Sequence, residues 1–584
     1  MNNRVLPFLT LSAGILPLQA VPSNKPETER PNILFIIADD ASYQHFGAYG
    51  CNWIQTPAFD KVAQDGILFT RCYTSNAKSA PSRSCILTGK YFFQMGAATN
   101  HLPYFPSDLE VFTEILEKNG YRTGYTGKGW GPGIVEKKEG KERLLTGKPY
   151  NQRTTQPPTK DISRVDYAEN FSDFLDEAPN GQPWFFWFGC FEPHRNYEYG
   201  SGARLSQKST DTIPGIPSFW PDNDIVRNDL LDYGFEIEYF DTQIGKFLTT
   251  LKERGILDNT LVIVTSDNGM PFPRCKGNNY EYSNHMPLAI MWKNKIKPGK
   301  KVRDIVNFMD FAPTILEVAN INNKPYPGHS LTEYFTDEKR SRPEYREHTI
   351  IGRERHDYGR PGNQGYPIRG IVTDRFLYIC NLKPHLLPAG NPETGYTDCD
   401  GSPTKTQILN LKRANIDRHY YNLSFGLRPE DELYDLSMDA ECMINLSKNP
   451  KYQAIKKELQ EILWHELQEN NDPRMTGDGD IFDRYPCSES VGINFWEKVT
   501  RGEITAPWKI TGWISPTDYS NYNEYPIKTH LLHETILFSI IILNLPVPDS
   551  VHGRNQITFH FREPHGITTT IHRQIMGKKQ SKAN

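Results

Sequence analysis

Three uninterrupted apolar runs, each followed by polar residues, constrain the fold of this chain more than any other feature. The runs are residues 32–38, 184–188 and 260–264. A short apolar run without alternation is typical of a strand that is buried on both faces of a parallel sheet. We therefore expect a large, mainly parallel sheet whose two faces are covered by helices.

Helix signals separate these runs. Thr56 and Pro57 have the residue types of a helix cap and of a first helical position. Residues 108–118 form a second predicted helix, which Gly120 ends, and residues 224–254 form a long third helix. Strands that alternate with helices predict an α/β sandwich.

Side chains that can bind a metal or move a proton follow each apolar run. These side chains are Asp39 and Asp40, then His194, then Asp267 and Asn268. The carboxyl ends of parallel strands meet at one edge of a sheet, so we expect these side chains to lie together. Carboxylate and amide oxygens suit a hard divalent cation, although each group alone also fits an ordinary cap or turn.

A further segment, residues 79–89, reads SAPSRSCILTG. Pro81 suits the first turn of a helix and therefore predicts Ser79 at the helix N-terminus. Free backbone N–H groups at that end favour an anion. Taken alone, Ser79 also fits an ordinary helix cap.

This segment resembles the signature of type I, formylglycine-dependent sulfatases, in which Cys or Ser is followed by Pro, Arg and Leu-Thr-Gly at fixed spacing. The resemblance extends over residues 32–473 and implies an alkaline-phosphatase-like α/β sandwich. It also implies that Ser79 is oxidised to 3-oxoalanine (formylglycine) by a maturation enzyme of the anaerobic bacterial type. Residues 192–195, 216–233 and 268–273 are similar to the heparan N-sulfatase (sulfamidase) branch.

A hydrated aldehyde has two hydroxyls on one carbon, so one can attack sulfur and the other can then expel sulfate, which a plain serine cannot do. The resemblance implies calcium as the cation, while the residues alone also allow magnesium. The expected ligands are Asp39, Asp40, Asp267, Asn268 and the oxygen at position 79.

The resemblance assigns further roles to basic residues. Arg83 would fix the geometry of position 79 and of the metal ligands, and Lys128 would contact the aldehyde hydrate and sulfate. His194 matches a histidine near the leaving oxygen and is a candidate general acid. Lys276 matches a sulfate-binding position and could equally protonate the leaving group. Many sulfatases carry a second histidine where this chain has Trp130.

Four more residues are candidates for the substrate pocket: His101, His285, Arg353 and His356. His285 is also an alternative for proton transfer, given Trp130. The expected substrates are O-sulfated or N-sulfated sugars of a glycosaminoglycan or mucin, with heparan sulfate favoured. The alternatives are a phosphatase or phosphodiesterase of related fold and an unmodified glycan-binding protein.

The chain is expected to contain a catalytic domain over residues 30–365 and a smaller α+β domain with a short antiparallel sheet over residues 366–515. An amphipathic helix belongs to the second domain, with its apolar face at Ile455, Leu459, Ile462, Leu463 and Leu467. Residues 516–584 form a tail without a functional assignment.

The first 20 residues have the pattern of a secretory signal peptide, which predicts a periplasmic or secreted protein. The apolar run at residues 536–545 is too short to span a bilayer. A net charge of −4 gives no electrostatic footprint for nucleic acid. The nine scattered cysteines do not favour a zinc site, and Cys380–Cys399 is the disulfide that we expect, if one forms.

Overall fold

The computed structural model describes residues 30–506 except residues 180, 322–324 and 337–345, together with residue 509 and the backbone of residues 555–562 and 568–575. The expected signal peptide and most of the tail lie outside the described residues. The two described tail segments, β18 (Asn555–Arg562) and β19 (Thr568–Ile575), pair as antiparallel strands.

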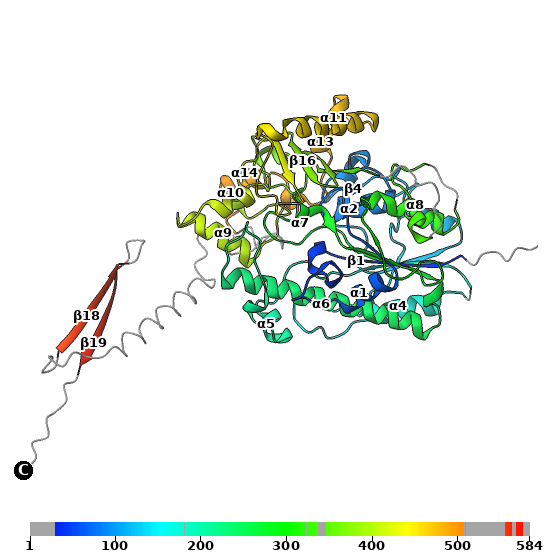
Figure 1. Cartoon of the computed structure of the whole chain (residues 1–584), viewed down its shortest axis with the longest axis horizontal. Coiled ribbons are helices and arrows are strands. Elements are labelled where there is room, and N and C mark those ends of the chain that lie inside the picture. The colour runs from blue at the N-terminus through cyan, green and yellow to red at the C-terminus, as the bar shows by residue number, and fades with distance from the viewer. Residues whose placement is uncertain are drawn as a thin grey trace, which may run out of the picture.

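The largest sheet in the described part of the chain has eight strands (Figure 1). In order across the sheet, they are β12 (Lys300–Val302), β2 (Ile67–Phe69), β11 (Leu288–Met291), β9 (Thr260–Ser266), β1 (Asn32–Ala38), β8 (Trp184–Gly189), β5 (Arg122–Gly127) and β7 (Lys148–Pro149). The central strands β9, β1, β8 and β5 are parallel, whereas β11 is antiparallel to both of its neighbours.

Strand β1 explains why the sheet is covered on both faces. Ile33, Phe35 and Ile37 belong to one buried apolar cluster, and Leu34 and Ile36 belong to another. Because successive side chains of a strand point to opposite faces, a continuous apolar run requires apolar partners on both sides. The prediction of a doubly covered, mainly parallel sheet is confirmed.

Helices form the two outer layers, as Figure 1 shows. The first apolar cluster includes α2 (Ser79–Thr88), α3 (Phe112–Lys118) and α8 (Phe311–Val318). The second includes α1 (Pro57–Asp65), α4 (Tyr167–Glu177) and α6 (Asp224–Glu253). The helices expected from residue 57 and over residues 224–254 are confirmed. Helix α3 begins at Phe112 rather than at residue 108, because Val111 has extended backbone angles.

A second sheet, in the C-terminal part of the chain, has four antiparallel strands. They are β14 (His348–Arg353), β15 (Ile368–Thr373), β16 (Phe376–Asn381) and β17 (Asp431–Asp435). Strand β14 lies before residue 366, where we expected the smaller domain to begin. The predicted amphipathic helix is α11 (Gln453–Glu469), which buries Leu459, Leu463 and Leu467.

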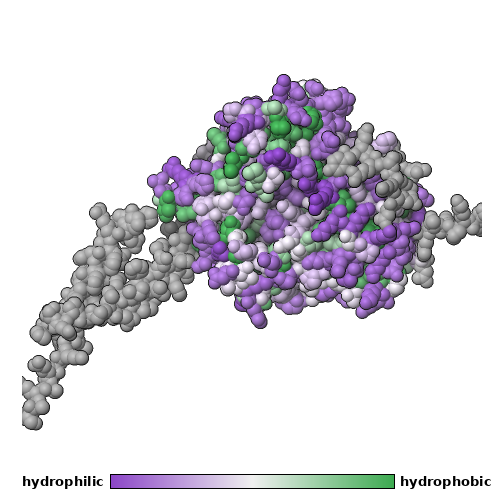
Figure 2. Space-filling view, in the orientation of Figure 1, coloured by the Kyte–Doolittle hydropathy of each residue, from purple (hydrophilic) through white to green (hydrophobic). Residues whose placement is uncertain are grey.

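Shorter elements lie between and beside the two larger sheets. The described residues also form two small sheets, β10-β3-β13 and β4-β6. The first contains β3 (Cys72–Tyr73), β10 (His285–Met286) and β13 (Val306–Asn307), and the second contains β4 (Tyr104–Phe105) and β6 (Ile134–Val135). Helix α9 (Pro403–Arg413) packs on α6. The face in Figure 2 is mostly hydrophilic, with scattered apolar patches.

All nine cysteines lie in the described part of the chain, and none forms a disulfide. The expected Cys380–Cys399 bond is therefore wrong. Cys380 is on β16 in the first apolar cluster, whereas Cys399 lies in the second. Proximity in sequence did not bring the two thiols together, because the chain between them crosses from one cluster to the other.

Candidate active site

The predicted strand-end residues lie at one edge of the large sheet. Asp39 and Asp40 follow β1, and Asp267 and Asn268 follow its parallel neighbour β9. The backbone joins the two ends, since the Asp267 amide donates to the Ala38 carbonyl. On the other side of β1, the Asp39 amide donates to the Glu192 carbonyl, beyond the end of β8.

Ser79 is the first residue of α2, as its sequence context predicts. Its hydroxyl oxygen lies 3.0 Å from Asp39 Oδ1 and 3.4 Å from Asn268 Oδ1. Only 2% of the residue is exposed. The serine is therefore buried between the helix N-terminus and the acidic strand ends, where an anion and a cation would both be favoured.

Three buried carboxylates surround this position. Asp39, Asp40 and Asp267 each offer one oxygen, and these oxygens lie within 4.8 Å of one another. Burial and the Asp39 charge raise the pKa of Asp267 to about 7. Burial would also raise the pKa of Asp39, but neighbouring positive charges, Lys128 foremost, hold it well below its usual range. The unfavourable charge on Asp267 and the all-oxygen donor set fit a hard divalent cation.

Arg83 connects these carboxylates to the neighbouring strand. Its Nε donates to Asp267 Oδ2 at 2.9 Å, and its Nη1 donates to the carbonyls of Lys128 and Gly129 at 2.9 and 2.8 Å. The side chain is fully buried. The guanidinium thus fixes the Asp267 carboxylate relative to the segment that carries Lys128.

Lys128 and His194 mark the more accessible side of the cluster. The Lys128 ammonium donates to Asp39 Oδ2 at 2.6 Å, and 16% of its side chain is exposed. His194 is 19% exposed, and its Nε2 lies 3.8 Å from Asp40 Oδ2. The Asp39 and Asp40 side chains, by contrast, are almost completely buried. A substrate would therefore approach from the side of Lys128 and His194.

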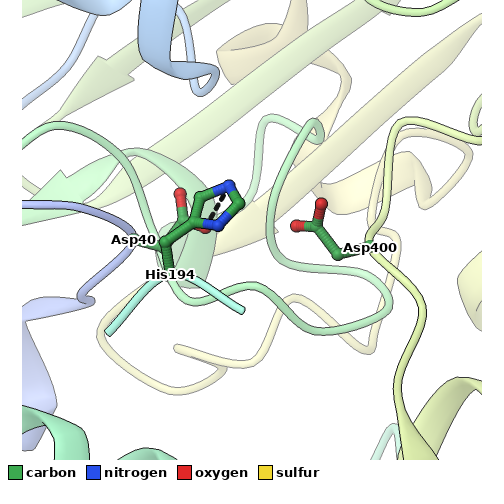
Figure 3. Close-up of side chains that lie close together, drawn as sticks. All are labelled: Asp40, His194 and Asp400. Atoms are coloured by element: carbon green, nitrogen blue, oxygen red, sulfur yellow. Dashed lines mark ion pairs between the residues drawn. The ribbon is translucent and has the colours of Figure 1, made fainter. Parts of the chain in front are cut away.

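A second group of possible ligands contains Asp40, His194 and Asp400 (Figure 3). The Lys276 ammonium lies among them, 2.7 Å from Asp40 Oδ2, 2.7 Å from Asp400 Oδ2 and 3.1 Å from His194 Nε2. Burial opposes this charge, but Asp40 and Asp400 raise the pKa of Lys276 above its ordinary value. The Lys276 ammonium thus supplies the positive charge among Asp40, His194 and Asp400, where a metal ion would otherwise be a candidate.

The sequence reasoning missed Asp400. It follows η10 (Pro392–Thr394) and precedes α9, in a polar turn that reads Asp398-Cys399-Asp400-Gly401. Two acidic residues in a turn are too common to indicate a site. Lys78, directly before Ser79, was missed as well, and its ammonium contacts Asp357 Oδ2 at 3.0 Å.

Three of the substrate-pocket candidates lie in a buried network behind the start of α2. His101 Nδ1 is 2.9 Å from Asp357 Oδ1, and His356 Nε2 is 2.8 Å from Asn76 Oδ1. Arg353 lies 3.1 Å from Asp398. Burial lowers the pKa of both histidines. At 4% exposure or less, these residues are buried, and their expected contact with the substrate stays a prediction.

His285 is not brought to the acidic cluster. Its ring nitrogens lie 2.7 Å from Glu281 Oε2 and 2.9 Å from the Thr70 carbonyl, and its ring stacks on Tyr43 and Tyr73. These contacts hold the histidine on β10 in the small sheet, and its expected part in proton transfer or substrate binding stays a prediction.

Trp130 occupies the position at which many sulfatases carry a histidine. Its indole Nε1 donates to Ser84 Oγ on α2 at 2.9 Å, and its ring packs edge-on against Phe105. Trp130, in the loop after β5, thus packs between α2 and β4. The basic side chains beside Asp40 are those of His194 and Lys276.

Comparisons with known proteins identify the family. The sulfatase family model matches residues 31–321, and the model described as N-sulphoglucosamine sulphohydrolase, C-terminal, matches residues 275–383. Human N-sulphoglucosamine sulphohydrolase is 28% identical over 488 residues, covering 76% of this chain and 91% of that protein. N-acetylglucosamine-6-O-sulfatase of Bacteroides thetaiotaomicron is 25% identical over 565 residues, covering 79% and 92%.

Solved structures show the same fold. One, described as a complex with its substrate D-glucosamine-2-N,6-O-disulfate, has a TM-score of 0.55 and 22% identity, covering 76% of this chain and 98% of that chain. The phosphonate monoester hydrolase of Agrobacterium radiobacter has a TM-score of 0.52 and 18% identity, covering 76% and 97%. The two family models together span residues 31–383, which is more than half of the chain. The chain therefore belongs to the sulfatase family.

Proposed function

We propose that this protein hydrolyses sulfate esters or N-sulfamates of carbohydrates, with the side chain at position 79 as nucleophile. The observation that carries the proposal is the position of Ser79. Its hydroxyl lies at the N-terminus of α2 and contacts Asp39 and Asn268 at the strand ends. Lys128 and Lys276 lie on either side of the same acidic cluster, each bonded to one of its carboxylates.

The acidic cluster is the proposed calcium site. Asp39, Asp40, Asp267 and Asn268 would hold the ion together with the oxygen at position 79. A bound divalent cation would lower the pKa of the nucleophile and neutralise sulfuryl oxygens. Oxidation of Ser79 to formylglycine would supply a hydrate with a second hydroxyl for release of sulfate.

The chain's own residues support this chemistry. The backbone N–H groups at the start of α2 would stabilise the anionic sulfate, and Lys128 and Lys276 would pair with its oxygens. Arg83 donates to both the Asp267 carboxylate and the Lys128 carbonyl, and so holds the two in a fixed relative position. His194 and Lys276 lie within hydrogen-bond distance of each other and would protonate the leaving oxygen or nitrogen.

A sulfated amino sugar is the substrate that we favour. The relatives that span most of this chain include an N-sulphoglucosamine sulphohydrolase and an N-acetylglucosamine-6-O-sulfatase. These names share a glucosamine unit but differ in the bond that is cleaved. We therefore propose glucosamine-containing glycosaminoglycans, such as heparan sulfate, as the substrate class.

We also propose that the protein acts after export, in the periplasm or outside the cell. The proposal rests on the leader-like residues 1–20. Within the part of the chain that the structure describes, no helix is long and apolar enough to cross a bilayer.

The decisive experiment measures sulfate release by protein produced together with an anaerobic-type maturation enzyme. Saccharides with a single N-, 2-O-, 3-O- or 6-O-sulfate identify the bond, and 4-nitrophenyl sulfate and phosphate compare the two reaction classes. We expect turnover of sulfate, with none in the Ser79→Ala control. Turnover of phosphate alone would identify a phosphatase. Binding of sulfated saccharides without turnover would identify a glycan-binding protein.

The mass of the Ser79 peptide tests the proposed modification. Oxidation to formylglycine removes two hydrogens, a decrease of about 2 Da. We expect this decrease in the active enzyme. An unmodified peptide in fully active protein contradicts the formylglycine mechanism while leaving the sulfatase activity itself in place.

Removal of calcium tests the proposed metal site. A chelator should abolish turnover and lower the melting temperature, because the ion binds only the folded chain and contributes about 2.7 kcal/mol at 100 times its Kd. Added calcium should restore both. The Asp267→Asn variant lacks one ligand and should respond to the chelator much less. Unchanged activity and melting temperature in the chelated wild type would refute the site.

A further inference from the structure

A short segment of the C-terminal region, residues 398–400, contacts basic residues on both sides of the nucleophile. The Asp398 carbonyl accepts from the Lys78 ammonium at 2.8 Å, and Asp400 Oδ2 accepts from Lys276 at 2.7 Å. Lys78 directly precedes Ser79. The segment therefore completes a site whose other residues come from the large sheet and α2.

Its neighbours hold this segment in one position. Asp398 Oδ1 accepts from the Asp357 amide at 2.9 Å, and Asp398 Oδ2 accepts from Arg360 at 2.7 Å. Gly277, next to Lys276, has a φ of +74°, and a Cβ there would lie 2.9 Å from Asp398 Cβ. The chain at Gly277 therefore packs directly against the chain at Asp398, and this contact places Asp400 next to Lys276.

The hydrogen bonds of Lys276 define its orientation. The ammonium donates to Asp40 and Asp400 and lies 3.1 Å from His194 Nε2. His194 Nδ1 lies 2.6 Å from the Arg195 carbonyl, which can only accept, so this nitrogen carries the ring proton. Nε2 is then the acceptor for Lys276. Asp400 and Asp40 thus both accept from the ammonium and direct it at His194. Figure 3 shows these three side chains, with Asp40 and Asp400 on either side of the His194 ring.

We propose that Asp400 is a positioning residue that keeps Lys276, and through it His194, beside the leaving atom of the substrate. Without the Asp400 carboxylate, Lys276 would pair with Asp40 alone and move toward the acidic cluster, away from His194 and the more exposed side of the site. The inference rests on the proposed sulfatase function and assigns a role to a residue outside the catalytic sheet.

The proposed role concerns one step of the reaction. When the nucleophile at position 79 forms its bond to sulfur, the sulfur–oxygen or sulfur–nitrogen bond breaks. Its electron pair stays on the leaving atom, which takes one proton from the Lys276–His194 pair. The product leaves as a hydroxyl or amine, and water returns a proton to the pair. A sugar leaving group requires this proton, whereas 4-nitrophenolate leaves readily without it.

The test therefore compares two leaving groups in Asp400→Asn and the wild type, both matured and checked by the mass of the Ser79 peptide. For the saccharide that the wild type hydrolyses, we expect kcat to fall about 10- to 100-fold with KM nearly unchanged, as for other residues that orient a catalytic group. For 4-nitrophenyl sulfate, the fall should be less than about threefold. Asp400→Glu, which keeps the carboxylate, should recover part of the saccharide activity.

The matched control is Glu393→Gln. Glu393 also forms an ion pair with a lysine of the C-terminal region, since its carboxylate lies 2.8 Å from the ammonium of Lys412 on α9. This variant should change neither rate. Equal losses with both substrates in Asp400→Asn, or no loss, would overturn the inference. If Asp400→Asn does not fold, the same comparison with Asp400→Glu decides, since a changed carboxylate position should again affect only the saccharide. A wild type inactive on every sulfate would instead refute the proposed function.

Discussion

At the scale of single residues, Arg83 makes contacts at the candidate site that depend on the shape of its guanidinium. Its planar guanidinium donates to Asp267 Oδ2 and to two backbone carbonyls, and its side chain is fully buried. A lysine can keep the charge but has a single ammonium, so it cannot reach all three acceptors from one position. Shape, rather than charge alone, makes this residue necessary.

We therefore expect Arg83→Lys to lower kcat by at least about 100-fold, because a shift of about 1 Å in the groups around position 79 is enough for such a loss. The variant should also be destabilised by about 3 kcal/mol, since buried partners are left unpaired. Turnover assays and thermal unfolding measure the two effects. Activity within threefold of the wild type would contradict this prediction.

Arg153→Lys is the control. Arg153 is 61% exposed and pairs with Asp173 at the surface. Exposed ion pairs contribute little to stability, so this variant should differ from the wild type by less than about 0.5 kcal/mol and keep full activity. The comparison separates the loss of the Arg83 geometry from a general effect of replacing arginine with lysine.

At the scale of elements, the ends of β5 and β8 determine where Lys128 lies. The Lys128 amide donates to the Gly189 carbonyl at 2.7 Å. A Cβ on Gly189 would lie 1.8 Å from the Lys128 carbonyl oxygen, which is itself an acceptor for Arg83. The last residue of β8 must therefore lack a side chain for the two strand ends to approach this closely.

Gly189→Ala should thus displace the Lys128 segment, lower turnover and destabilise the fold by about 1–3 kcal/mol, as expected for overpacking. Gly245→Ala on α6 is the opposite case, because its Cβ would make an ordinary 3.7 Å contact with Ala58. That variant should be stabilised by about 0.5–1 kcal/mol with unchanged activity. The prediction fails if Gly189→Ala keeps both the wild-type rate and melting temperature.

At the scale of the whole molecule, ion pairs connect the large sheet and α2 to the C-terminal region. Lys78 pairs with Asp357, and Lys276 pairs with Asp400. Both aspartates follow β14 in the chain, whereas both lysines lie within the matched sulfatase family region. The C-terminal region therefore supports the site as well as packing on the sheet.

The pH dependence of the free energy of unfolding is a property of the whole molecule. His45 contributes to it, because its side chain is buried beyond the end of β1, with its Nδ1 3.1 Å from the Tyr233 hydroxyl. Burial lowers the pKa of His45 from 6.5 to about 3. Below pH 6.5 the unfolded chain binds a proton that the folded chain does not. Stability should therefore fall as the pH decreases from 6.5 toward 3, by about 2 kcal/mol at pH 5.

His45→Gln should remove this part of the pH dependence, so thermal unfolding at pH 7 and pH 5 should differ less in the variant than in the wild type. Gln can still accept from Tyr233, which limits other effects. His385→Gln is the control, because His385 is exposed and should leave the dependence unchanged. Identical pH dependence in His45→Gln and the wild type would contradict the assignment to His45.

The sequence by itself predicted that Ser79 begins a helix and that acidic side chains follow two of the strands. Ser79 and Arg83 belong to one local motif on one helix, and Asp39, Asp40 and Asp267 each lie within three residues of the end of an apolar run. Both relations are local along the chain. The rule that carboxyl ends of parallel strands meet then brings the local segments together.

Only the tertiary structure decided which distant groups complete the site. Asp400 is 124 positions from Lys276, and His285, which is nearer in sequence, is bonded to Glu281 and Thr70 instead. The lack of a Cys380–Cys399 disulfide has the same origin. Contacts between segments that are far apart in the sequence depend on how the two sheets and the loops between them pack. A local pattern of residue types does not determine that packing.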